Sequence, residues 1–268
     1  GNPEGWLQGD EWDTVMNYDA FMEPLTWFLT GMEKHSDEYR EDLLGNGEAF
    51  IGAMKTHMRS LHMSALQTAM NELSNHDHSR FLTRTNHKVG RISYAGAEAA
   101  SEGVNPAVMR EAVAIQMTWP GAPTVYYGDE AGLCGFTDPD NRRTYPWGRE
   151  DYQMIDFHRV MIRIHKNYEV LKTGSLGFLW NDYQGLCYAR FSRKEQMIVI
   201  INNQAESRDV EIQLWQAGIS RLADTKLKRI VVTSAEGFTE EPEEYTATAG
   251  ILKITMPAFG AMVLHHKN

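Results

Sequence analysis

NPAVMREAVAIQMTWPGAPTVYYGDE, residues 105–130, predicts a helix, a buried strand and a polar loop in direct succession. Asn105 followed by Pro106 is a typical helix start, because asparagine caps free backbone N–H groups and proline fits the first turn. The two prolines within residues 120–123 end that helix. Thr124–Tyr127 is rich in β-branched and aromatic side chains, which indicates a strand, and the residues after it are polar.

Strands and helices alternate over residues 13–168. Such alternation is typical of a parallel α/β architecture. Besides the two elements above, the predicted elements are a strand at Asp13–Asn17, a helix from Asn46 to about Met63, an apolar stretch at Leu66–Leu73 and a helix from about Asp151 to Tyr168.

The pattern changes after about Val170, where apolar and polar residues alternate in short runs separated by polar turns. This period of two is typical of strands with one buried face. We therefore predict an antiparallel β domain, a small sandwich. The alternating runs are Gly185–Phe191, Gln196–Ile201, Asp209–Leu214, Ile251–Thr255 and Gly260–Leu264.

Composition excludes several classes of function. The 268 residues include 26 Lys and Arg against 36 Asp and Glu, a formal charge of −10, which opposes nucleic-acid or anionic-membrane partners but not a neutral sugar. No stretch reaches the roughly 18 apolar residues that a membrane span needs. The first residues lack the features of a signal peptide. Cys134 and Cys187 permit one disulfide, but base rates favour two small buried side chains, so cytoplasmic and secreted locations both stay open.

Polar clusters follow two of the predicted strands, at Asn75–Arg80 and from Gly128 to Arg143. In an α/β barrel, functional side chains lie in the loops after the strands. Two other interpretations stay open. Asp77 has the chemistry of a helix N-cap. His76 and His78 resemble a metal-binding pair, although no third ligand has zinc-like spacing.

Four motifs resemble the neopullulanases and cyclomaltodextrinases of the α-amylase superfamily, in family order and spacing. They are Trp6–Tyr18 (sixth-strand region), Asn75-His76-Asp77 with Arg80-Phe81 (seventh strand), Pro120–Glu130 (eighth strand) and Asp138–Arg142 (substrate loop). The resemblance implies that residues 1–169 form the last strand–helix units, about strands 6–8, of a (β/α)8 TIM barrel. Residues 170–268 are then a C-terminal antiparallel β-sandwich.

The resemblance also implies roles for four residues. Asp77 aligns with the catalytic carboxylate that stabilises the transition state through sugar hydroxyls, and His76 with a hydrogen-bond donor to the same sugar. Asp138 and Arg142 align with residues that hold the neighbouring glucose. A fixed carboxylate suits an oxocarbenium-like transition state, because its bonds to sugar hydroxyls strengthen there. No metal or cofactor is implied.

The family's nucleophile Asp and acid Glu precede the segment WLQGD (residues 6–10), and neither can be assigned in this chain. A retaining hydrolase needs two carboxylates about 5 Å apart. We therefore expect a fragment of a glycoside hydrolase that cuts α-1,4-glucans, or transfers them, and expect the isolated chain to be inactive. A partial barrel leaves strand edges uncovered, so we also expect self-association.

Two alternatives remain. The chain could be a shortened, non-catalytic glucan-binding protein, with Trp147, Trp180 and Trp215 as stacking faces. It could also be a metal-dependent hydrolase built on His76, Asp77 and His78. The preferred glucan, cleavage of α-1,6 bonds and the balance of hydrolysis against transfer are not determined by these motifs.

Overall fold

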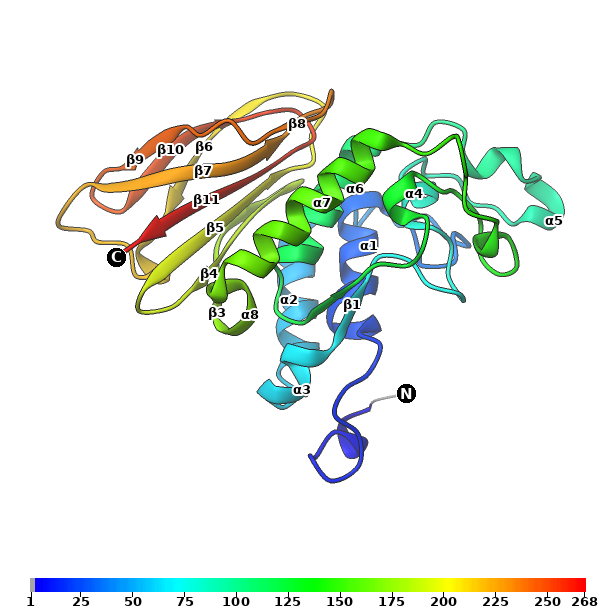
Figure 1. Cartoon of the computed structure of the whole chain (residues 1–268), viewed down its shortest axis with the longest axis horizontal. Helices are drawn as coiled ribbons and strands as arrows, with labels where there is room; N and C mark the ends of the chain where they lie inside the picture. The colour runs from blue at the N-terminus through cyan, green and yellow to red at the C-terminus, as the bar shows by residue number, and fades with distance from the viewer. Residues whose placement is uncertain (1–2) are drawn as a thin grey trace.

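The computed structural model describes residues 3–268 and has a helical part and a β part that pack against each other (Figure 1). The β part forms one end of the molecule, and the segment that carries α5 lies at the other. The helices are α1 (Glu23–Thr30), α2 (Gly47–Met58), α3 (Met63–Thr68), α4 (Phe81–Arg84), α5 (Ile92–Ala95), α6 (Pro106–Thr118), α7 (Tyr152–Asn167) and α8 (Glu169–Thr173).

Three strand segments of the helical part run parallel. Strand β1 (Met70–Glu72) pairs in parallel with β2 (Ala122–Thr124), and Met16 adds one parallel bridge to Met70. Each segment is followed along the chain by one or more helices, as the alternation of the sequence predicts.

The two predicted strands and the apolar stretch between them need correction. Asp13–Asn17 is reduced to the single bridge at Met16, because only the first residue of the short strand β1 lies opposite it. The stretch Leu66–Leu73 is divided between α3 and β1, since Ala69 adopts an extended conformation that ends the helix. The predicted strand Thr124–Tyr127 is shifted toward the N-terminus, because β1 pairs with Ala122–Thr124.

The helix predictions are confirmed for α6 and α7, while the predicted end of the helix at Met63 is wrong. Asn46 caps α2 by accepting the Ala49 N–H at 3.0 Å. That helix ends at Met58, because Ser60 and Leu61 bond carbonyls three positions back and His62 is extended. Helix α1 was not predicted; it starts with a proline in its first turn and ends at Gly31, which has a φ of 68°.

The β part contains a seven-stranded antiparallel sheet, ordered β3-β4-β5-β11-β7-β8 with β9 also paired to β7, and a two-stranded sheet of β6 and β10. All five alternating runs of the sequence are strands. The bounds are β3 (Ser175–Asp182), β4 (Gly185–Phe191), β5 (Glu195–Asn202), β6 (Arg208–Gln213), β7 (Thr225–Thr233), β8 (Phe238–Thr239), β9 (Glu244–Ala247), β10 (Ile251–Met256) and β11 (Gly260–Lys267).

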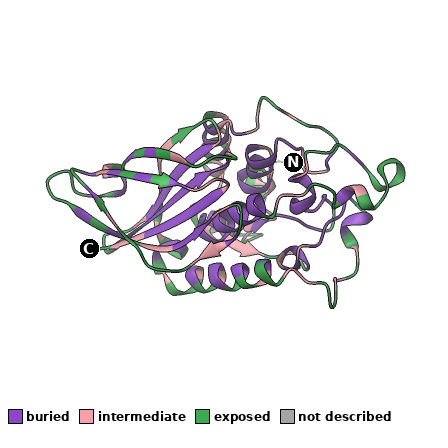
Figure 2. Cartoon of the chain, turned by 90° about the horizontal axis from the view of Figure 1, so that it is seen from above, coloured by how far each residue is buried: buried purple, intermediate pink, exposed green. Residues whose placement is uncertain are grey.

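One hydrophobic core joins the two parts. Figure 2 shows buried positions gathered where strands of the β part meet the helices. Trp119, just after α6, contacts Phe50 of α2 and Tyr188 of β4 with ring centroids 5.9 and 5.0 Å apart. Arg190 is buried and donates to the Thr118 carbonyl at 2.9 Å. The division at residues 169/170 stays a prediction, and the hydrophobic contacts continue across it.

Both cysteines are buried and unpaired, which confirms their interpretation as small core side chains. Within residues 3–268, no helix combines the length and the apolar character that crossing a membrane requires.

Candidate functional site

The loops that follow β1 and β2 come together at one edge of the parallel strands, as expected for carboxyl ends of neighbouring parallel strands. The first loop forms the turn Asn75–His78, and the second includes residues 137–142. Hydrogen bonds join the two loops directly, for example from Arg142 Nε to the His76 carbonyl at 3.0 Å. All four predicted site residues therefore lie in one region.

Asp77 presents its carboxylate to solvent. The side chain is 52% exposed, and its one polar contact among the described residues is His76 Nε2 at 3.5 Å. The Asp77 N–H donates to Asn75 Oδ1 at 2.9 Å. The N-cap interpretation of Asp77 is wrong, because α4 begins at Phe81 and the Phe81 N–H donates to Ser74 Oγ instead. The carboxylate is thus free to accept hydrogen bonds from a ligand.

The two histidines of the turn lie in different environments. His76 is half exposed, whereas His78 is buried between the ring edges of Tyr18 and His35, with centroids 4.9 and 4.8 Å away. Burial, assisted by the charge of Arg84, lowers the pKa of His78 to about 3, so this ring is neutral at pH 7. The described residues contain no group of three His, Cys, Asp or Glu side chains that could hold a metal ion.

Asp138 and Arg142 form an ion pair across one turn of the loop. Arg142 Nε lies 2.7 Å from Asp138 Oδ1, and both side chains are half exposed. The Asp138–Pro139 peptide bond is cis. Because Arg142 also bonds the His76 carbonyl, it connects the pair to the Asp77 turn. Their roles toward a sugar stay predictions.

A buried polar network beneath the turn was not predicted. Asn75 Nδ2 donates to Glu72 Oε2 at 3.0 Å and to the Tyr18 hydroxyl at 3.1 Å. Burial raises the pKa of Glu72, although Asn75 and His76 oppose the shift. Burial, with the nearby charges of Glu72 and Asp77, raises the pKa of Tyr18 to about 12. The sequence contains one signal that could have indicated a functional role for Glu72, since this residue places a carboxylate within the apolar stretch Leu66–Leu73.

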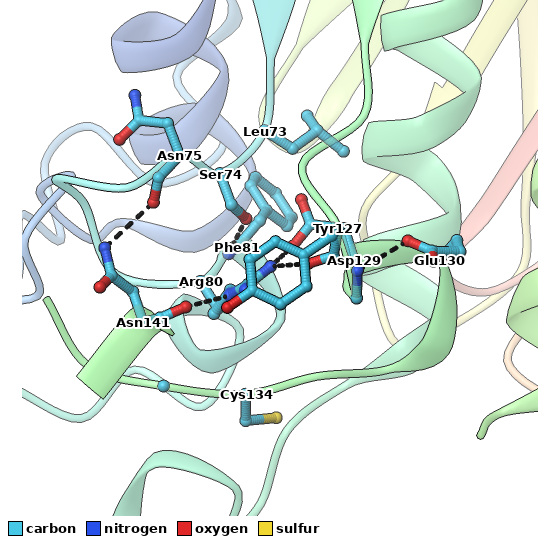
Figure 3. Close-up of polar contacts among 12 residues, drawn as sticks. Leu73, Ser74, Asn75, Arg80, Phe81, Tyr127, Asp129, Glu130, Cys134 and Asn141 are labelled. Atoms are coloured by element: carbon cyan, nitrogen blue, oxygen red, sulfur yellow. Dashed lines mark hydrogen bonds and ion pairs between the residues drawn. The ribbon is translucent and has the colours of Figure 1, made fainter. Parts of the chain in front are cut away.

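A buried ion pair ties the two loops to each other (Figure 3). Arg80 Nη1 lies 3.0 Å from Asp129 Oδ1, and both side chains are buried. The Arg80 guanidinium also donates to the carbonyls of Tyr127 and Asn141. It lies 4.1 Å from the centre of the Tyr126 ring. Arg80 belongs to the loop after β1 and Asp129 to the loop after β2, so this pair fixes their separation.

A cavity of about 950 Å³ opens beside the first strand segment. Residues 14–20 line one side, and Thr56, His57, Ser60 and Leu61, from the end of α2 and the turn after it, line another. Met16 pairs only with Met70 among the described residues, so this edge of the parallel strands is open.

The model of the α-amylase catalytic domain matches residues 3–217 of this chain. The chain belongs to the α-amylase family. It is 31% identical to neopullulanase 2 of Thermoactinomyces vulgaris over 97% of this chain and 38% of that protein. It is 30% identical to the amylopullulanase of Thermoanaerobacterium thermosulfurigenes over 96% of this chain and 14% of that protein.

Solved structures of the family share the fold. The debranching enzyme from Nostoc punctiforme matches 98% of this chain and 50% of its own length, with a TM-score of 0.72 and 25% identity. A cyclomaltodextrinase matches 98% of this chain and 38% of its own length, with a TM-score of 0.71 and 24% identity. The chain thus spans half or less of the length of these relatives.

Proposed function

We propose that this chain is the C-terminal part of a retaining hydrolase that cleaves α-1,4-linked glucans. In this proposal, the Met16 segment, β1 and β2 are the last three strands of a (β/α)8 barrel, and the β part is a C-terminal β-sandwich. Membership of the α-amylase family supports it, as does the match to 38% of a neopullulanase. Within residues 3–268 no further strand pairs with the outer edges of the Met16 segment and of β2, which is consistent with a barrel that other polypeptide completes.

The exposed Asp77 carboxylate on a firmly held turn is the observation that carries the proposal. Asp77 would bond sugar hydroxyls at the cleavage position, with His76 donating to the same sugar. Asp138 and Arg142 would hold the adjacent glucose. A carboxylate that is already in place favours the oxocarbenium-like transition state, in which the hydroxyl hydrogen bonds are strongest.

Retaining hydrolysis also needs a nucleophile and an acid about 5 Å apart on the two sides of the scissile bond. We assign neither to residues of this chain. The proposal places both on polypeptide that precedes this segment in the family's barrel, and it follows that the chain by itself is inactive.

Hydrolysis assays test this assignment. We expect that maltooligosaccharides and β-cyclodextrin, incubated with the chain at pH 5–8, yield no reducing ends above the level of an Asp77→Asn variant. A related neopullulanase serves as the positive control. Turnover by the wild-type chain that disappears in the variant would contradict the proposal, because other carboxylates, Glu72 first, would then supply the chemistry.

The open strand edges lead us to propose self-association as well. The outer edges of the Met16 segment and of β2, beside which the described residues place no further strand, can pair with another chain, and Val125 and Tyr127 expose apolar surface beside β2. We expect light scattering at micromolar concentration to give a mass above the 30.5 kDa of one chain. A monodisperse monomer would count against association through these edges.

A non-catalytic glucan-binding protein is the second candidate, and one observation favours it. Trp147 is 79% exposed and packs against Tyr145 with ring centroids 4.5 Å apart, as an aromatic sugar-stacking surface requires. Trp180 and Trp215 are partly buried under Arg208 and Arg221. Glucan binding that is lost in Trp147→Ala but kept in Asp77→Asn would select this candidate.

A further inference from the structure

Four successive backbone carbonyls in the turn Asn75–His78 accept hydrogen bonds from side chains of the loop 137–142. Turns at a protein surface normally leave such groups to water. The donors and acceptors are Asn141 Nδ2 to the carbonyls of Asn75 (3.0 Å) and His78 (2.8 Å), Arg142 Nε to that of His76 (3.0 Å) and Thr137 Oγ1 to that of Asp77 (2.6 Å).

Asn141 is the central member of this set. It is fully buried, and its amide nitrogen donates to both ends of the turn (Figure 3 shows the bond to Asn75). The orientation of the amide is fixed, because only its nitrogen can donate to two carbonyl oxygens. Asn75 Oδ1 holds the turn from the inside by accepting the N–H groups of Asp77 and His78 at 2.9 and 3.1 Å.

We propose that Asn141 is a positioning residue for Asp77. It bonds the first and last carbonyls of the turn, so it fixes the turn's curvature and hence the direction of the Asp77 side chain. It belongs to the same loop as Asp138 and Arg142 and bonds the turn that carries His76 and Asp77, so it also fixes the spacing between the residues predicted to contact the two neighbouring sugars. Preorganisation of this kind removes the cost of ordering the site when a ligand binds.

The chain offers a matched control in Asn202, at the end of β5. Asn202 is also fully buried, and its Nδ2 likewise donates to two backbone carbonyls, those of Glu206 (2.9 Å) and Pro257 (2.8 Å). In both residues the side-chain oxygen is buried without a hydrogen-bond partner among the described residues. Asn202 lies in the β part, so Asn202→Leu reproduces the loss of stability without touching the turn.

The test compares Asn141→Leu with Asn202→Leu by amide hydrogen exchange and by titration with maltoheptaose. We expect both variants to lose a similar amount in Tm. We expect the protection factors of the Asp77 and His78 amides to fall at least tenfold in Asn141→Leu and to stay unchanged in Asn202→Leu. We expect the affinity for maltoheptaose to fall about tenfold in the same variant. Asn141→Asp, which keeps the side-chain shape but not the two donors, gives the same comparison if Asn141→Leu does not fold.

The two arms separate this inference from the proposed function on which its sugar-binding part rests. Unchanged protection at Asp77 and His78, or an equal fall in Asn202→Leu, would overturn the positioning role whatever the glucan result. Reduced protection in a chain whose wild type binds no maltoheptaose would support the positioning role and contradict the proposed function.

Discussion

Arg80→Met is expected to lower the free energy of unfolding by about 3–5 kcal/mol at pH 7, the usual effect of removing one member of a buried ion pair. The Asp129 side chain is only 4% exposed in the native chain, and the substitution removes the positive charge beside it. It also removes the donors to the carbonyls of Tyr127 and Asn141. Urea denaturation followed by tryptophan fluorescence measures the loss. Arg159→Met, which breaks a pair exposed on α7, is the control and is expected to change stability little.

The loss in Arg80→Met is expected to depend on pH. Burial already raises the pKa of Asp129 above its ordinary value of 3.8, and Arg80 opposes that shift. Without Arg80, the folded-state pKa rises further. The deficit is then full above this raised pKa and shrinks as pH falls to the folded-state pKa of the wild type, below which the carboxyl is protonated in both folded proteins. A deficit that is constant between pH 4 and 7 would show that the ion pair is not its source.

Glu111→Gln is expected to stabilise the chain at pH 8. Glu111 lies on α6, is fully buried, and neither of its carboxyl oxygens has a hydrogen-bond partner among residues 3–268. Burial raises its pKa well above 4.5. As pH rises, Glu111 therefore ionises in the unfolded chain before it ionises in the folded chain. Ionisation favours the unfolded state, so the free energy of unfolding falls as pH rises above 4.5. The loss is about 1.4 kcal/mol per pH unit until the folded-state pKa is reached.

Glutamine cannot ionise, so it removes this loss while keeping the shape of the side chain. Chemical denaturation at pH 4 and pH 8 measures both ends of the range, and the pH 4 pair of proteins is the internal control. We expect no gain at pH 4 and a clear gain at pH 8. A variant that is less stable than the wild type at pH 8 would mean that the native carboxylate is ionised and stabilised by a partner.

Local signals in the sequence predicted part of the fold. Asn105 with Pro106 located the start of α6, because capping and the proline ring act within one turn. The position of β2 could not be predicted in the same way. Strand character in the sequence is confined to Thr124–Tyr127, whereas pairing with β1 selects Ala122–Thr124. Trp119 and Tyr188 are in contact although they lie 69 positions apart in the sequence. A periodic pattern of apolar residues cannot predict a contact over that separation.

The candidate site likewise combines residues that the sequence predicted with residues that it did not. Its four predicted residues came from motifs, and the structure brings them together. The residues that hold them in place were not found from the sequence. Asn141 acts through bonds to backbone carbonyls 63 and 66 positions away. Every residue type has the same backbone carbonyl acceptor, so the sequence does not indicate which carbonyls will accept such bonds.

Titration of the isotope-labelled chain with maltoheptaose, followed by NMR, is the most direct test of a glucan site at Asp77. We expect saturable shift changes at His76, Asp77, Asp138 and Arg142, with an affinity that falls at least tenfold in Asp77→Asn. Shift changes confined to Trp147 or to the β part, and unaffected by Asp77→Asn, would contradict the assignment of this site.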